Sequence, residues 1–238
     1  QGMRLSLAGG RIDGSVVSIG NEGRIVVKLT SAEPMLDVLE EEGVPPLPPY
    51  IKRGGGDSRL AGIDRERYQT VYATVPGAIA APTAGLHFTA EMLAQLEARE
   101  ISLTAITLHV GPGTFKPVKT DDIEGHTMEP ERFIVSADAA DRITNARRAG
   151  GRVVAVGSTT VRTLESVAVE HTGLKACSGR TSIFIRPPCE FKIVDAMLTN
   201  FHLPKSTLMM MVSAFAGREV IMEAYREAIR MNYRFYSY

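Results

Sequence analysis

The sequence lacks the features of a membrane or secreted protein. No apolar run reaches the roughly 18 residues that a membrane-spanning helix needs, and the most apolar stretch is Leu208–Ala216. The chain opens with no basic stretch followed by an apolar one, which is the pattern of a signal peptide. We therefore expect a soluble, cytoplasmic protein with no membrane partner.

The sequence also has few cysteines and no net charge. The two cysteines, Cys177 and Cys189, show no spacing that suggests a disulfide framework, which fits a reducing compartment. The 27 basic and 27 acidic residues cancel to a formal net charge of zero. Non-specific nucleic-acid binding is mostly phosphate neutralisation, so this balance argues against a protein that coats nucleic acid, though not against a local basic patch.

Familiar catalytic motifs are also absent. The sequence has no Gly-x-Gly-x-x-Gly fingerprint, Walker motif, His-Glu-x-x-His pair, Gly-x-Ser-x-Gly elbow or Cys-x-x-Cys pair. Metal sites usually leave ligand pairs at short range in the sequence, and none is visible. We therefore expect no bound metal.

The first part of the chain predicts β structure. Arg11–Ile19 and Arg24–Leu29 are rich in Val and Ile and flank a Gly-Asn-Glu-Gly turn, which is typical of a hairpin. A short helix is expected over Met35–Glu42. Four prolines between Pro45 and Pro49 then mark a stiff connection, so we place a domain boundary there: residues 1–44 and 45–238.

After this boundary, helical and strand patterns alternate. A loop is expected over Arg53–Gly62 because it is rich in glycine and charge. We expect helices over Ala90–Arg99 (capped by Thr89), Ala137–Arg148 (capped by Ser136), Val161–Glu170, the segment after Ser206, and Arg218–Met231. We expect strands over Ile101–Val110, Arg132–Val135, Arg152–Gly157, Ser182–Arg186 and Phe191–Asp195. The alternation predicts an α/β domain with a mixed sheet, preceded by a smaller all-β insert.

Four of the five histidines lie in segments rich in Gly, Pro and Thr at the ends of predicted strands, whereas His171 lies in a plain polar stretch. The segments are Ala80–Thr89, Leu108–Thr114, His126–Glu131 and Leu198–Ser206. Loops at strand ends are where sites are assembled, so these segments predict an enzyme active site.

Each segment also has a plainer interpretation. Ala80–Thr89 leads into a helix whose N-terminus suits a carboxylate or phosphate, or it is a tight turn of small residues. Gly157–Arg162 is a strand–turn–helix junction with three hydroxyls and an arginine, which fits either an anion site or an ordinary Ser/Thr cap. The glycines of Leu108–Thr114 admit a ligand close to the backbone, or simply make a turn.

Taken together, these segments resemble one known family, the S-adenosylmethionine:tRNA ribosyltransferase-isomerases of queuosine biosynthesis. The resemblance covers most of the chain from Pro45 onward, in the same order. It is carried by Pro45–Ile51, Tyr68–Ala73, Ala80–Thr89, Thr107–Val118, Gly151–Ser166, Leu198–Gly217 and Tyr233–Tyr238.

The chain departs from the family pattern in three places. Glu129 stands where the family has a histidine, Ser182 where it has an aspartate, and Pro188-Cys189 where it has a glycine and an aromatic residue. The family normally has a further N-terminal stretch and continues a few residues beyond Tyr238.

The resemblance implies a reaction and a set of ligands. The ribosyl part of S-adenosylmethionine, a co-substrate and not a retained cofactor, moves to the 7-aminomethyl-7-deazaguanine wobble base of tRNA. The product is epoxyqueuosine, and adenine and methionine are released. The resemblance also implies that residues 1–44 are the remnant of an inserted β-barrel domain. We expect a monomer.

This chemistry assigns roles to the histidines. A sulfonium acidifies the neighbouring ribose C–H, so a base is needed, and an acid would assist the departure of adenine. Histidine serves either role, so the catalytic candidates are His87, His109, His126 and His202, with base and acid unassigned. The substrate-binding candidates are Thr83, Gly85, Phe88, Gly111, Gly113, Thr114, Phe115, Ser158, Thr159, Thr160, Arg162, Asn200, Phe201 and Lys205.

Within this set, Arg162 or Lys205 is expected to bind the methionine carboxylate or a tRNA phosphate. We expect Phe88, Phe115 and Phe201 either to stack on a base or to be ordinary residues of the hydrophobic core. Two other functions fit the residues. One is a metal-dependent nucleoside hydrolase with the histidines as ligands. The other is a non-catalytic RNA-binding module that uses the prolines and the arginines Arg218, Arg226, Arg230 and Arg234.

Overall fold

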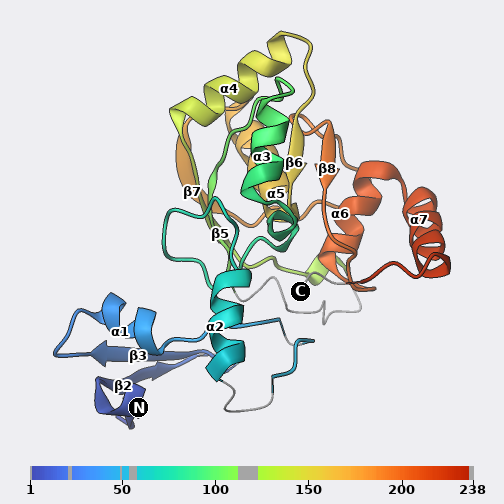
Figure 1. Cartoon of the computed structure of the whole chain (residues 1–238). Helices are drawn as coiled ribbons and strands as arrows, with labels where there is room; N and C mark the ends of the chain where they lie inside the picture. The colour runs from blue at the N-terminus through green and yellow to red at the C-terminus, as the bar shows by residue number, and fades with distance from the viewer. Residues whose placement is uncertain (1, 21–22, 49, 54–57, 112–122, 236–238) are drawn as a thin grey trace. The chain divides into compact units, whose positions relative to one another are not determined.

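The chain folds into two compact units, Gln1–Pro45 and Pro46–Tyr238, each described by itself (Figure 1). The computed structural model describes residues 2–20, 23–48, 50–53, 58–111 and 123–235. Within these residues, no helix has the length and apolar character to cross a membrane.

The first unit is an antiparallel sheet with a short helix. Its strands are β1 (Arg4–Leu7), β2 (Ile12–Ile19) and β3 (Ile25–Thr30), in the order β1-β2-β3, followed by α1 (Met35–Glu42). The predicted hairpin and helix are thus confirmed. Arg11 binds the carboxylates of Glu33 and Glu41, both at 2.7 Å, and so ties β2 to the helix region.

The described strands of this unit do not close into a barrel, contrary to the expectation of a barrel-like domain. Three strands are too few for closure, since small barrels need about five or more. The unit is therefore an open sheet, and its place in a larger inserted domain remains a prediction.

Within its described residues, the second unit contains two small sheets flanked by helices. Its elements are α2 (Ser58–Arg67), the 3₁₀ turn η3 (Thr83–His87), α3 (Ala90–Glu97), β4 (Thr107–His109), η5 (Ile123–Gly125), β5 (Glu131–Val135), α4 (Ala137–Arg148), β6 (Val154–Val156), α5 (Ser158–His171), β7 (Cys177–Thr181), β8 (Ala196–Leu198), α6 (Thr207–Ala216) and α7 (Arg218–Arg230). One sheet is antiparallel, in the order β4-β5-β7, and the other is the parallel pair β6-β8. The mixed α/β character is confirmed, but the two strand orientations occur in separate sheets.

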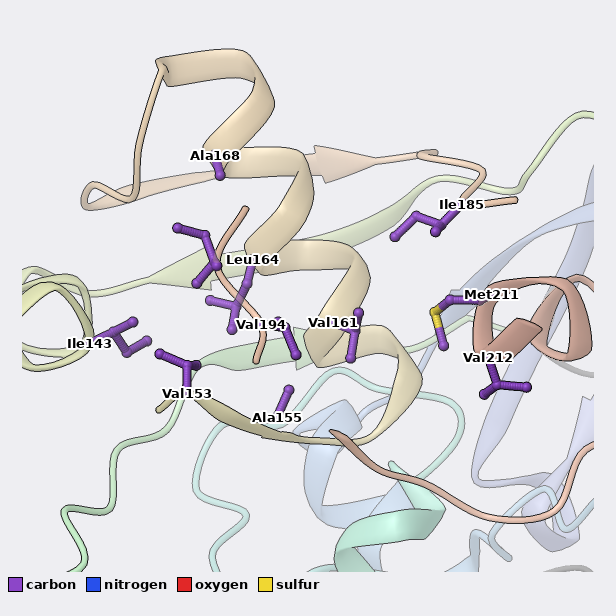
Figure 2. Close-up of a cluster of buried hydrophobic side chains, with 11 residues drawn as sticks. Ile143, Val153, Ala155, Val161, Leu164, Ala168, Ile185, Val194, Met211 and Val212 are labelled. Carbon is purple, nitrogen blue, oxygen red and sulfur yellow. The ribbon is translucent and has the colours of Figure 1, made fainter. Parts of the chain in front are cut away.

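Helix α5 lies at the centre of the core of this unit. Val161, Leu164 and Ala168 on this helix are at most 2% exposed. Figure 2 shows them beside Val153 and Ala155 of the β6 region, with Met211 and Val212 of α6 completing the cluster. Val167 of α5 belongs to a second cluster with Phe133 and Val135 of β5. Both sheets are therefore anchored to one helix.

Three predicted helix starts are confirmed by their caps. The side-chain oxygens of Thr89, Ser136 and Ser206 accept hydrogen bonds from backbone N–H groups three residues later, at 3.1–3.2 Å. These bonds satisfy N–H groups that have no partner within the helix.

Several predicted elements are wrong. The predicted loop over Arg53–Gly62 gives way to α2 from Ser58, and the strand expected over Ile101–Val110 is limited to β4. The strands expected over Ser182–Arg186 and Phe191–Asp195 are absent. Instead, β7 ends at Thr181, just before the first range, and β8 begins at Ala196, just after the second. For Phe191–Asp195 the reason is visible at Glu165, whose carboxylate accepts hydrogen bonds from the backbone N–H groups of residues 192–194, so these groups do not pair with another strand.

Candidate active site

The five segments singled out in the sequence are linked in the structure by a continuous series of contacts. The backbone N–H of Ala80 donates to the carbonyl of Val110 at 3.3 Å, which joins the first two segments. Gly157 N donates to the carbonyl of Leu198 at 2.9 Å, because the parallel strands β6 and β8 end side by side. Segments far apart in the sequence therefore meet at one edge of a small sheet, where α/β proteins usually bind ligands.

Asn200 connects the first and last of these segments. Its Nδ2 lies 2.9 Å from Nε2 of His87, and its Oδ1 accepts a hydrogen bond of 3.2 Å from the hydroxyl of Thr83. Thr83 and His87 are the two ends of η3, and a single amide therefore engages both ends of this turn. The predicted binding residues Thr83 and Asn200 and the predicted catalytic residue His87 form one hydrogen-bonded group.

His202 lies in the same loop, in a more enclosed setting. Its Nε2 lies 3.1 Å from the hydroxyl of Thr199, and its backbone N–H donates to the hydroxyl of Tyr225 on α7 at 2.6 Å. Burial lowers the pKa of His202 from its ordinary value of 6.5 to about 4. The imidazole is therefore neutral near pH 7.

His109 ends β4 and packs against the backbone of Gly77. A Cβ atom on Gly77 would lie 2.8 Å from Nδ1 of His109, and the φ of Gly77 is +129°, a conformation that glycine adopts readily. The glycine thus lets the imidazole approach the segment that leads into η3. The predicted residue Gly111 follows, half-buried, whereas Gly113, Thr114 and Phe115 lie outside the described residues.

Gly85 is enclosed by two side chains that the sequence did not indicate as part of a site. A Cβ on Gly85 would collide with the hydroxyl of Tyr72, and it would lie 2.8 Å from the methyl of Thr70. Burial raises the pKa of the Tyr72 phenol. The predicted residue Phe88 follows η3 and is half-buried.

The N-terminus of α5 faces η3. A Cβ atom on Gly157 would lie 4.0 Å from the Cβ of Ala84. Gly157 is the N-cap of α5 and has a φ of +90°. No side chain caps α5, so the ordinary Ser/Thr cap considered above is not present here. The hydroxyl of Thr160 donates back to the carbonyl of Val156 at 2.8 Å, and Thr159 is buried, which leaves Ser158 the more accessible hydroxyl.

Arg162 is 5% exposed and belongs to the interior. Its Nη1 binds Oε2 of Glu131 at 2.7 Å, and its Nε donates to the carbonyl of Ile183 at 3.3 Å. It therefore holds β5 against α5, and its Nη2 is buried with no hydrogen-bond partner among the described residues. The predicted contact of Arg162 with a substrate anion stays a prediction. The other predicted cation, Lys205, is exposed.

Two more predicted residues have neighbours that limit their roles. Phe201 is stacked on Phe235, with ring centroids 4.5 Å apart, and meets Tyr225 edge-on at 5.1 Å. One face of its ring is thus already covered. His126 meets the ring of Phe184 edge-on at 5.4 Å, and the ion pair Glu131–Arg162 connects its segment to α5.

Sequence reasoning missed Tyr72, Glu131 and Tyr225 as individual residues that shape the site. Tyr225 lies on a helix with an ordinary amphipathic pattern, and no motif near it pointed to the backbone of His202. Among the described residues, no three His, Cys, Asp or Glu side chains are grouped so as to hold a metal ion.

Two comparisons with known proteins give consistent matches. A family model described as "Queuosine biosynthesis protein" matches residues 1–238. The crystal structure of the S-adenosylmethionine tRNA ribosyltransferase from Thermotoga maritima is similar, with a TM-score of 0.54 and 32% sequence identity. The match covers 100% of this chain and 63% of that one, so this chain spans less than two thirds of the length of that enzyme.

Proposed function

The chain belongs to the queuosine biosynthesis protein family, and from this premise we propose that it is the catalytic part of an S-adenosylmethionine:tRNA ribosyltransferase-isomerase. The proposed reaction transfers and isomerises the ribosyl group of S-adenosylmethionine onto the 7-aminomethyl-7-deazaguanine wobble base of tRNA. Its products are epoxyqueuosine-tRNA, adenine and methionine. The protein then acts in the cytoplasm on tRNA.

One structural observation carries the proposal. Segments 80–89, 108–111, 157–162 and 198–206 are joined by hydrogen bonds and close packing, and they bring His87, His109 and His202 into one connected region. Sequence similarity alone does not show that these residues lie together, since His87 and His202 are more than a hundred positions apart in the chain. Their convergence supports a single site with several groups able to move protons.

The chemistry requires a group that removes a proton from the ribose carbon next to the sulfonium, and a second that assists the departure of adenine. A neutral imidazole has a lone pair for the first task. His202 is neutral near pH 7, and the low pKa that burial gives it makes it a weaker base than an ordinary histidine. His87, His109 and His126 remain candidates beside it. Exposed Lys205 is the proposed contact for the methionine carboxylate or a tRNA phosphate.

The decisive experiment supplies full-length protein with S-adenosylmethionine and tRNA that carries the aminomethyl-deazaguanine base. Adenine release and a matching mass gain on the tRNA are the expected results. The His202→Gln variant is expected to lose activity, and His171→Gln, outside the site, is the matched control. Adenine release without a mass gain, abolished by a chelator, would instead favour the metal-dependent nucleoside hydrolase. tRNA binding with neither product would favour the RNA-binding module.

A further inference from the structure

The contacts of Asn200 determine which ring nitrogen of His87 carries a proton. An amide nitrogen has two N–H groups and no available lone pair, so it only donates hydrogen bonds. Nδ2 of Asn200 lies 2.9 Å from Nε2 of His87. That ring nitrogen must therefore be the bare, accepting one, and the proton of the neutral ring is on Nδ1.

The amide is held at its other end as well. The hydroxyl of Thr83 donates to Oδ1 of Asn200 at 3.2 Å, which leaves Nδ2 directed at the imidazole. Thr83 and His87 are held at fixed separation by η3, where Gly85 N donates to the carbonyl of Pro82 at 2.8 Å and Phe88 N to that of Gly85 at 3.1 Å. The turn thus presents a donor and an acceptor to one amide.

The other nitrogen of His87 is directed away from this arrangement. His87 is exposed, and among the described residues its ring makes no hydrogen bond except that to Asn200. A ligand in the site therefore meets Nδ1–H. Proton uptake at Nε2 would bring two donors face to face and break the bond to Asn200.

We propose that Asn200 is a positioning residue that holds His87 as the Nδ1–H tautomer, so that His87 donates a hydrogen bond to an acceptor atom of the substrate and is not the general base. The part of this inference that concerns the substrate rests on the proposed function, whereas the tautomer does not. Among the proposed catalytic histidines, the base is then His109, His126 or His202.

The test reads the tautomer directly, without any substrate. Long-range ¹H–¹⁵N spectra of the ¹⁵N-labelled full chain distinguish a protonated ring nitrogen from a bare one, and the His87→Gln variant identifies the resonances of His87. The expected result is a protonated Nδ1 and a bare Nε2 near pH 7. A protonated Nε2 on His87 in the unaltered protein overturns the proposal.

Two variants separate positioning from mere packing. Asn200→Asp preserves size but offers only acceptors, so the proton is expected on Nε2. Thr83→Ser keeps the hydroxyl that orients the amide and is expected to keep the Nδ1–H form, whereas Thr83→Val is expected to lose it in part. An unchanged His87 pattern in Asn200→Asp would show that the amide does not select the tautomer.

Activity measurements then keep the two proposals apart. If ribosyl transfer is observed, Asn200→Asp is expected to lower kcat/KM at least tenfold, because the substrate no longer meets a donor at Nδ1. If the unaltered protein releases no adenine while the His87 spectra show the expected form, the proposed function fails together with the substrate contact of His87, and the tautomer assignment stands. If it is active and His87 carries its proton on Nε2, only the present inference fails.

Discussion

Arg162 and Glu131 form an ion pair in the interior, with Nη1 and Oε2 2.7 Å apart and each residue 5% exposed. The pair joins the first residue of β5 to the first turns of α5, and β5 also carries the strand partners of β4 and β7. Arg162, predicted from the sequence to bind an anion, thus also links a strand to a helix.

Removal of one partner is therefore expected to destabilise the protein strongly. Glu131→Leu leaves a buried guanidinium without its counter-charge, which costs about 3 to 5 kcal/mol. Urea unfolding measures the loss. The double variant Glu131→Leu/Arg162→Met removes both charges and is expected to recover most of the stability; a double variant no more stable than the single one would contradict this account.

The carboxylate of Glu165 is expected to control the order of the segment before β8. It accepts from the backbone N–H groups of residues 192, 193 and 194 at 2.7, 3.0 and 2.9 Å. Glu165→Gln retains one acceptor oxygen and is expected to lose about 1 to 3 kcal/mol of folding stability. Hydrogen exchange should become faster at these three amides and not at those of α7, which serves as the internal reference.

Gly85→Ala is expected to disturb η3 because its Cβ would meet the Tyr72 hydroxyl and the Thr70 methyl. Overpacking of this kind costs about 1 to 3 kcal/mol. Gly62→Ala, in α2 with open space around its Cβ position, is the matched control, and it is expected to be neutral or stabilising by up to about 1 kcal/mol. Equal melting temperatures for the two variants would rule out the steric explanation.

The pH dependence of stability should report the burial of His202. Its pKa in the fold, about 4, lies below the ordinary value of 6.5, so the unfolded chain binds the proton more readily. The stability that depends on neutral His202 is fully present above pH 6.5 and is lost as the pH falls toward 4. The free energy of unfolding falls by at most about 3 kcal/mol for this reason. Unfolding free energies measured across this range should fall less steeply in His202→Gln, and the His171→Gln control should behave like the unaltered protein.

Tyr225→Phe is expected to weaken the loop that carries Asn200 and His202. The phenol accepts the backbone N–H of His202 at 2.6 Å, and its loss leaves a polar group without a partner at a cost of about 1 to 3 kcal/mol. Tyr233→Phe is the control, since that ring contacts Phe201 but is 56% exposed. If both variants unfold at the same urea concentration, the hydroxyl contributes nothing measurable.

How far the sequence predicts this structure depends on the range of the interactions involved. The caps at Thr89, Ser136 and Ser206 were predictable because a cap and its helix are neighbours in the chain. The strand predicted over Phe191–Asp195 was wrong because an apolar run does not show that a distant carboxylate, Glu165, binds its backbone. Likewise, the histidine segments were identifiable by composition, but their connection through Asn200 was not.

This long range also concerns how the protein is made. Asn200 lies 113 residues after His87 and 117 after Thr83. During translation, η3 leaves the ribosome long before its amide partner has been synthesised, and contacts this far apart in the sequence form slowly because a long loop must close. A nascent chain therefore carries His87 well before Asn200 exists to fix which ring nitrogen bears its proton.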